Sequence, residues 1–292
     1  MNRSVGSRHA VILPCKLHKA IERKSTHFKM KTPRTDKQRR HLSDWNLRIC
    51  VFVLFALSWQ LSAQFMKNML IPTFTETING FIQLVFVTGR IWRPLYISNQ
   101  ALVLGYILSI AVAIPLGLAA GRVKWIDRIL NPYIGVFLAV PIAPLIPIAI
   151  TALGLGLASR VAIVFLFTFV FIAVNTRAGV RNVDPGLIEM AKSFGASERQ
   201  IWHRIVIPGA VPAIFAGLRI GLGRAVAGMV IVELLLVASG LGRLLLEFAG
   251  RLQAEFVFAT VLVVIVEALL LLSLMRFAEQ KVAPWAHDSS IG

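Results

Sequence analysis

The sequence has few of the residues and motifs on which catalysis and metal binding depend. Its 292 residues include two cysteines, Cys15 and Cys50, and six histidines, none of which lies inside a long apolar run. No Cys-x2-Cys, no His-Glu-x2-His and no phosphate-binding Gly-x4-Gly-Lys-[Ser/Thr] sequence occurs. We therefore expect no metal, no cofactor, no ATP-binding site and no catalytic residue in this chain.

Charged residues are also scarce, at 15%, whereas 57% of the residues are hydrophobic and the mean hydropathy is +0.72. A soluble domain has a much lower apolar content. Several apolar runs approach the roughly 20 residues that a helix needs to cross a bilayer. They are 49–66, 98–120, 130–152, 158–176, 211–237 and 256–275. The sequence thus predicts an all-α, polytopic integral membrane protein with six transmembrane helices, and the shorter run 78–88 predicts an interfacial helix.

Acidic residues are fewer still, 14 against 31 Lys and Arg, which gives a net charge of +17. The excess lies mostly in residues 1–48, before the first span, where it favours orientation and contact with anionic lipid over binding to nucleic acid. Six spans with both termini inside place 23 of the 31 basic residues in cytoplasmic segments and six outside. This positive-inside bias predicts a multi-pass membrane protein with two cytoplasmic termini.

One polar segment of about 30 residues stands between the fourth and fifth apolar runs. Asp184-Pro185 is typical of a helix start, because a capping acid precedes proline at the first helical position. Gly195 suits the left-handed residue that ends a helix, and Ser197 opens a second short helix. Pro208 is expected to break the chain before the next span. A helix–glycine–helix loop on a membrane protein is typical of a docking element.

This loop resembles the cytoplasmic EAA loop of ABC importer permeases. The family pattern is Glu-Ala-Ala, three residues, Gly, and nine residues to Ile-x-Leu-Pro. The positions that match are Glu189, Ala191, Gly195, Ile205 and Pro208, while Met190 and Ile207 replace an alanine and a leucine. Residues 175–181, 183–185 and 217–219 resemble the nitrate/sulfonate/taurine branch in particular. The likeness runs from about residue 98 to Trp285.

The resemblance implies a permease subunit of the cell inner membrane that forms the solute pathway of an ATP-driven importer. It implies a cytoplasmic ABC ATPase that binds the loop, a periplasmic solute-binding protein, and a homodimer of this chain in the membrane. The solute would be a small anion of the nitrate, sulfonate or taurine class. The residues expected to dock the ATPase are Asp184, Glu189, Met190, Ala191, Phe194, Gly195 and Pro208.

Prolines and glycines mark two further features of the apolar runs. Pro141, Pro144 and Pro147 are three residues apart, and broken helix at membrane depth is tolerated where it lines a cavity, so these prolines are candidates for the translocation pathway. Alternatively, they form a kink that serves packing alone. Glycine pairs such as Gly117/Gly121 and Gly217/Gly221 predict close helix contacts, either within the chain or at a dimer interface.

Four charged residues lie within the apolar runs, where each must face protein or water. Residue counts place Arg219 and Arg224 at depths near that of Glu267, so an ion pair with Glu267, as in Arg224–Glu267, is one interpretation. The other is that Arg219 or Arg224 faces the pathway and attracts an anion. Glu233 is nearer the outer face and is expected to serve packing or gating.

The predicted organisation has four parts. Residues 1–47 form a basic and disordered cytoplasmic tail, 48–97 the first span with a periplasmic interfacial segment, 98–276 the transmembrane core with the EAA-type loop at 184–208, and 277–292 a cytoplasmic tail. An alternative function is an ion- or proton-coupled secondary transporter, with Arg224 and Glu267 as a relay. That protein would need no ATPase, and its loop would have no partner.

Overall fold

The computed structural model describes residues 34–66, 70–236 and 239–286, and all regular structure in this part of the chain is helical. The chain divides into two compact units, residues 1–58 and 59–292. The first contains most of α2 (Arg34–Met66). From Trp45 to Ser58 every side chain except that of Ala56 is exposed, and most of them are apolar, as in a helix that crosses a bilayer.

The disordered tail predicted for residues 1–47 differs from the structure in part. Residues 1–33 lie outside the described residues, but α2 already begins at Arg34. No glycine or proline occurs between Arg34 and the first apolar run, so nothing in the sequence stops the helix there. Residues 45–65 are one of five described segments long and apolar enough to cross a membrane.

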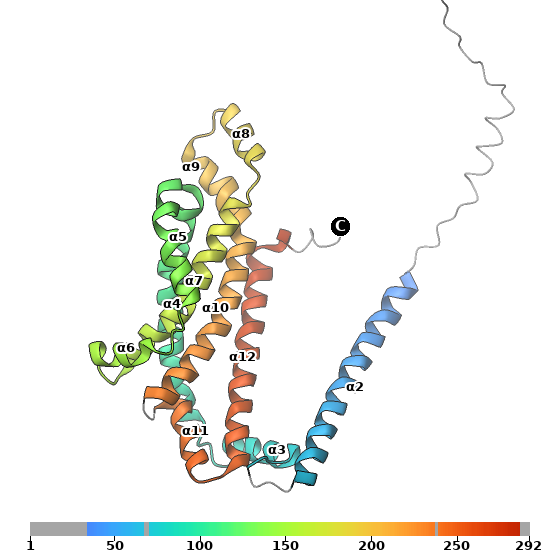
Figure 1. The fold of residues 1–292 in the computed structure, drawn as a ribbon. Coiled ribbons are helices and arrows are strands. Elements are labelled where there is room, and N and C mark those ends of the chain that lie inside the picture. The colour runs from blue at the N-terminus through green and yellow to red at the C-terminus, as the bar shows by residue number, and fades with distance from the viewer. Residues whose placement is uncertain (1–33, 67–69, 237–238, 287–292) are drawn as a thin grey trace, which may run out of the picture. The chain divides into compact units, whose positions relative to one another are not determined.

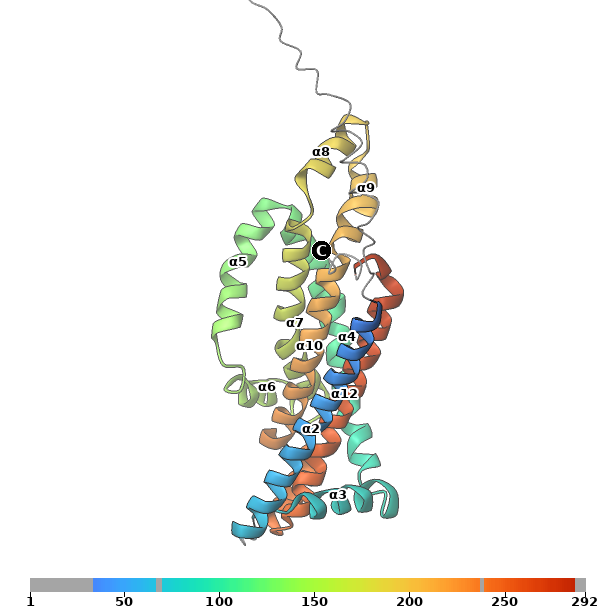
Figure 2. The ribbon, with the colours of Figure 1, turned by 90° about the vertical axis from the view of Figure 1, so that its right-hand side faces the viewer.

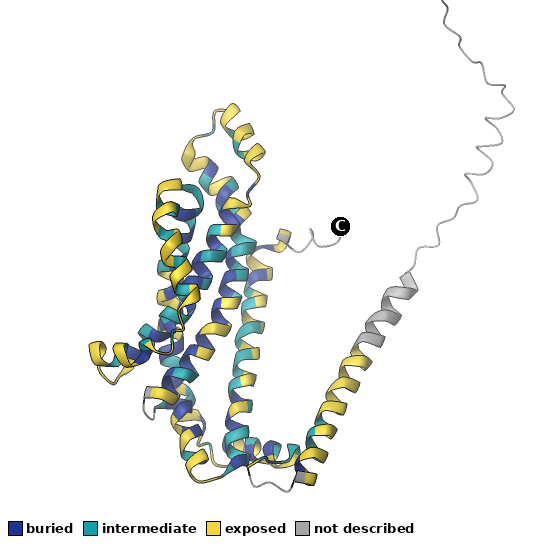
Figure 3. Ribbon diagram, in the orientation of Figure 1, coloured by how far each residue is buried: buried dark blue, intermediate teal, exposed yellow. Residues whose placement is uncertain are grey.

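The other four long helices form a bundle in the second unit, as Figures 1 and 2 show. They are α4 (Trp92–Arg122), α7 (Leu157–Arg181), α10 (Ile207–Leu236) and α12 (Ala254–Val282). α7 packs along both α4 and α10 and so forms the centre of the bundle. Figure 3 shows buried residues where these helices face one another.

Glycines allow α7 to approach its neighbours closely. A Cβ at Gly117 of α4 would lie 2.6 Å from Thr176 Cβ, and one at Gly221 of α10 would lie 2.9 Å from Ile172 Cγ1. Gly105, Gly121, Gly217 and Gly228 meet α7 in the same way. Both predicted glycine pairs thus serve contacts within the chain, one of the two alternatives that the spacing leaves open.

The run 130–152 does not form the sixth long helix that its hydropathy predicts. It divides between α5 (Lys124–Ala139) and α6 (Leu145–Leu153), which are separated by non-helical backbone. Pro141 and Pro144 lie at this break, because proline removes a backbone donor and disfavours helical conformation in the residue before it. Pro147 is accommodated in the first turn of α6, where its missing donor costs nothing.

Short helices close the two ends of the bundle. At one end α3 (Phe74–Ile82) continues into a π-helical turn, Gln83–Val87, and lies across the bundle axis as an interfacial helix would (Figures 1 and 2). α11 (Gly240–Gly250) lies at the same end. At the opposite end are α8 (Pro185–Ser193) and α9 (Glu198–Ile201), which form the predicted loop.

Candidate functional site

The loop helix α8 begins as its sequence predicts. The Asp184 carboxylate accepts a hydrogen bond from the Gly186 amide at 2.8 Å, and Pro185 occupies the first turn. The side chain thus satisfies an amide at a helix start that would otherwise lack a partner. Asp184 therefore has a local structural role whatever else it contacts.

Gly195 ends α8 in the left-handed conformation, with φ of +75°. The Gly195 amide donates to the Lys192 carbonyl and the Ala196 amide to the Ala191 carbonyl, both at 2.9 Å. These two bonds form a Schellman motif, which turns the chain sharply toward α9. The turn keeps α8 a rigid unit at the end of the bundle.

The two faces of α8 differ. Ile188 and Ala191 are partly buried against the chain's own core, whereas Leu187, Met190 and Phe194 point outward. The exposed fractions of the outward side chains are 48%, 53% and 85%. Ala191, expected to dock the ATPase, is thus half covered already. Leu187, which the motif does not include, belongs to the outer surface, and its helical spacing from Met190 and Phe194 could have indicated this.

A shallow groove of about 350 Å³ adjoins this outer face. Besides the α8 residues, Arg204, Ile205 and Pro208 line it, as does Trp285 from the 3-10 turn Pro284–Ala286. Trp285 is 52% exposed. It lies far from the loop in sequence, so local sequence patterns could not have assigned it to this surface.

Pro208 does not break the chain before the next span, contrary to the prediction. α9 passes through a π-helical turn, Trp202–Val206, directly into α10. In a regular α-helix the ring of Pro208 would clash with the carbonyl four residues earlier. The wider turn, in which the Ile207 amide bonds the Trp202 carbonyl, relieves that conflict and keeps the helix continuous. Movement of the loop can therefore pass directly into α10.

Ion pairs brace the loop against the bundle. The Glu198 carboxylate lies 3.2 Å from both Arg122, at the end of α4, and Lys192 of α8. On the neighbouring α5, Asp127 pairs with Arg177 at 2.5 Å and with Arg181. Glu198 thus ties the loop to α4, and Asp127 ties α5 to α7 at the same end of the bundle.

The expected pair Arg224–Glu267 does not form. Glu267 Oε1 accepts a hydrogen bond from Asn99 Nδ2 of α4 at 2.6 Å, while the Arg224 guanidinium lies 4.7 Å from the ring centroid of Phe171 on α7. Depth along the helices, on which the prediction relied, does not fix the direction in which a side chain points. α12 turns Glu267 toward α4, and α10 turns Arg224 toward α7.

Arg219 has a carboxylate partner that the sequence did not indicate, Glu279 near the end of α12. The Glu279 side chain is 10% exposed. This pair ties α10 to α12. Because Glu279 lies near the polar end of its helix, hydropathy gave no reason to consider it as a membrane-embedded partner.

Glu233 is fully buried and organises the end of the bundle that contains α11. It accepts hydrogen bonds from Ser98 Oγ at 2.7 Å and from the Gly242 amide at 3.1 Å, and Arg160 lies 3.5 Å away. Ser98 Oγ in turn accepts from the Leu241 amide at 2.9 Å. The network joins α4, α7, α10 and α11 and gives Glu233 a packing role, one of the two roles, packing or gating, that were expected of it.

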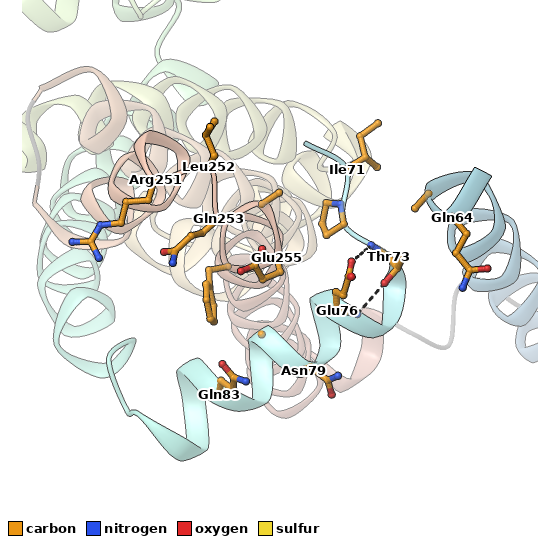
Figure 4. A pocket seen from close by; sticks show the side chains of 15 residues that line it. Gln64, Ile71, Thr73, Glu76, Asn79, Gln83, Arg251, Leu252, Gln253 and Glu255 are labelled. Atoms are coloured by element: carbon orange, nitrogen blue, oxygen red, sulfur yellow. Dashed lines mark hydrogen bonds between the residues drawn. The ribbon is translucent and has the colours of Figure 1, made fainter. Parts of the chain in front are cut away.

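A polar pocket of about 850 Å³ lies at the end of the bundle opposite α8. Figure 4 shows four of the polar residues that line it: Asn79 of α3, Gln83 of the π-helical turn, and Gln253 and Glu255 at the start of α12. Thr73 and Glu76 hold the start of α3 in a reciprocal capping box, with bonds of 2.8 and 3.2 Å. Among the described residues, no group of three or more His, Cys, Asp or Glu side chains could hold a metal ion.

Comparisons with known proteins agree with this architecture. Residues 113–284 match the family described as the binding-protein-dependent transport system inner membrane component. The taurine transport system permease of Escherichia coli (strain K12) is 28% identical over 238 residues, which cover 80% of this chain and 86% of that protein.

Two other relatives have related names. The putative aliphatic sulfonates transport permease of Escherichia coli (strain K12) is 31% identical, covering 75% of this chain and 84% of the relative. The nitrate import permease of Synechocystis sp. (strain PCC 6803) is 30% identical, covering 65% of this chain and 69% of the relative. A solved inward-facing structure of a methionine ABC transporter shares the fold, with a TM-score of 0.55 and 19% identity over 68% of this chain and 97% of that one.

Proposed function

The chain belongs to the family of binding-protein-dependent transport system inner membrane components, and from this premise we propose that it forms the solute pathway of an ATP-driven importer. It is a multi-pass membrane protein. In the proposed transporter two copies of the chain meet in the membrane, in contact with lipid. The termini and α8 lie on the cytoplasmic side, and α3 and α11 lie on the outer side.

The observation that carries the proposal is the outer face of α8. A short helix, fixed at both ends by Asp184 and Gly195, presents Leu187, Met190 and Phe194 away from its own core. A side chain as apolar as Phe194 at 85% exposure on a cytoplasmic loop gains stability when a partner covers it. An ABC ATPase subunit is the partner that fits an importer of this family.

Transmission of motion follows from the continuity of the loop with the span. α8 is joined to α9 by the tight Gly195 turn, and α9 runs without interruption into α10. When ATP closes the two ATPase subunits, a displacement of α8 would pull on α10 and on α7, which packs beside it. The bundle would then alternate between inward-open and outward-open states. ATP is bound by the partner, and the permease needs no cofactor or catalytic residue of its own.

The proposed solute is a small anion of the nitrate, sulfonate or taurine class, delivered by a periplasmic binding protein. The names of the relatives support this class. In the chain itself, the break at Pro141 and Pro144, with Pro147 just after it, and Arg224 of α10 are the proposed lining of the pathway, with α10 as the moving element. Arg219, the other arginine expected there, is instead paired with Glu279. The polar pocket beside α3 lies at the end that would face the binding protein.

Co-purification with the ATPase tests the docking surface. Phe194→Asp puts a charge on the most exposed apolar side chain of α8 and should abolish recovery of the ATPase with the permease. Met190→Asp should weaken it. Because both side chains are exposed, the thermal stability of the permease alone should change little.

A charge of the same kind on an exposed helix elsewhere provides the control. Leu246→Asp on α11, which is 48% exposed at the opposite end of the bundle, should leave recovery of the ATPase unchanged. Normal recovery with Phe194→Asp, or equal loss with Leu246→Asp, would contradict docking on α8.

A further inference from the structure

One arginine midway along a long helix of the bundle carries a charge that the described protein does not neutralise. The structure describes five arginines on α7 and α10. Four of them, Arg160, Arg177, Arg181 and Arg219, form ion pairs with carboxylates. Arg224 forms none among the described residues, where its neighbour is the aromatic ring of Phe171. An uncompensated cation at membrane depth is rare and needs a specific reason.

Arg224 lies well inside the membrane-spanning part of α10. At about 1.5 Å per residue it is roughly 26 Å from the helix start at Ile207 and roughly 18 Å from its end at Leu236. A guanidinium exposed to lipid at such a depth is strongly unfavourable. The exposed face of α10 at Arg224 must therefore meet water or another protein surface.

The surface around Arg224 is not packed against the described part of the chain. Ile220, Gly223, Arg224 and Ala227 are exposed on one face of α10, at helical spacing of three and four. A Cβ at Gly223 would meet nothing within 4 Å, whereas those at Gly217, Gly221 and Gly228 would meet α7. Small residues beside the guanidinium thus leave open space next to it.

Phe171 fixes the guanidinium without using its hydrogen-bond donors. The two groups are 4.7 Å apart, in the range of a cation–π contact. Stacking on a ring orients the planar fork of five donors while leaving them available for a ligand. Among the described residues the Arg224 guanidinium donates no hydrogen bond to the protein, so these donors can meet the oxygens of a small oxyanion.

We propose that Arg224, oriented by Phe171, is the residue that selects anions in the solute pathway. This inference rests on the proposed function, because it assigns the exposed face of α10 to that pathway. The solute class would be a small anion with several oxygens on one centre, such as a sulfonate or nitrate. One charge attracts such a solute and repels cations, and a single contact is weak enough to let the anion leave.

Thiol labelling near Arg224 tests the inference without requiring transport. In membrane vesicles that contain the whole transporter, Cys15→Ser and Cys50→Ser remove the native thiols, and Ala227→Cys places one a single helical turn from Arg224. Two methanethiosulfonate reagents of similar size are compared, one with a sulfonate and one with a trimethylammonium group. The sulfonate reagent should react faster, and Arg224→Gln should lower this preference roughly tenfold or more.

Two variants separate the charge from a structural effect. Arg224→Lys keeps the charge and should retain most of the preference. Arg219→Gln removes a charge that is already paired with Glu279 and should leave the preference unchanged. A thiol at position 227 that reacts with neither reagent, or a preference that Arg224→Gln does not alter, would overturn the inference.

Uptake distinguishes this inference from the proposed function. With labelled nitrate and labelled taurine as probes, Arg224→Gln should reduce ATP-dependent uptake of the probe that the wild-type transporter carries, at normal recovery of the ATPase. Unchanged uptake in this variant would also overturn the inference. If the wild type shows no ATP-dependent transport with any solute while the thiol preference persists, the proposed function fails and the anion-attracting site remains.

Discussion

Gly195 is the residue whose conformation matters most to the docking loop. Its φ of +75° is strained for any side chain, although a Cβ there would meet nothing within 4 Å. Gly195→Val should therefore cost about 1–2 kcal/mol through backbone strain rather than through a clash. The strain would deform the turn between α8 and α9. We expect reduced recovery of the ATPase and reduced solute-stimulated ATP hydrolysis.

Gly135 provides a matched control at the residue scale. It lies inside α5, and a Cβ there also meets nothing within 4 Å, but its φ is not positive. Gly135→Ala should leave ATPase recovery intact and raise thermal stability slightly, because alanine favours a helix by up to about 1 kcal/mol. Equal behaviour of Gly195→Val and the wild type would contradict the role of the left-handed turn.

Local features of the site could be predicted from the sequence because they depend on neighbouring residues. The cap at Asp184 and the turn at Gly195 both follow from short-range backbone chemistry. The partners of Arg219, Arg224 and Glu267 could not be predicted, since they depend on how each helix is rotated about its axis. The contribution of Trp285 to the groove depends on the tertiary fold in the same way.

At the scale of the elements, the start of α11 packs against the buried carboxylate of Glu233. The start of α11 comes so close that a Cβ at Gly240 would lie 2.3 Å from both Glu233 Oε1 and Ser98 Oγ, at a φ of +65°. Gly240→Ala should displace α11 and lower the melting temperature in detergent by several degrees.

Gly250, at the other end of α11, is the control for this change. A Cβ there would meet nothing within 4 Å, so Gly250→Ala should leave the melting temperature nearly unchanged. Equal stability of the Gly240→Ala and Gly250→Ala variants would show that the Glu233 network does not hold α11 in place.

The pair Arg219–Glu279 connects α10 to α12, and a double-mutant cycle measures its strength. Glu279→Gln alone leaves the partly buried Arg219 without its partner and should lower thermal stability. Adding Arg219→Gln should restore part of the loss, with a coupling of about 0.5–3 kcal/mol. Strictly additive effects of the two changes would contradict a stabilising pair.

The break of the run 130–152 is also an element-scale feature, and composition alone was misleading there. Hydropathy predicts one span because it counts apolar residues, and all of α6 is apolar apart from Thr151. The helix ends instead where Pro141 and Pro144 disturb the backbone. The long helices α4, α7, α10 and α12 were predictable because their apolar runs hold at most one proline each, Pro115 in α4 and Pro212 near the start of α10, and the helix continues through it.

At the scale of the whole molecule, the two ends of the bundle should lie on opposite sides of the membrane. Ser193→Cys on α8 and Leu252→Cys between α11 and α12 are both at exposed positions. In intact cells, with Cys15 and Cys50 replaced by serine, a membrane-impermeant thiol reagent should label position 252 and should label position 193 only after lysis. Labelling of position 193 in intact cells would reverse the proposed orientation.

Uptake by the purified protein in liposomes tests the central claim most directly, because the importer and the ion-coupled alternative give opposite results. The permease is reconstituted with its ATPase and binding protein, and uptake of labelled nitrate, taurine and methanesulfonate is measured with and without ATP. We predict uptake of at least one probe that requires ATP and both partners and that Phe194→Asp abolishes. Uptake by the permease alone, driven by a proton or sodium gradient without ATP, would contradict this account.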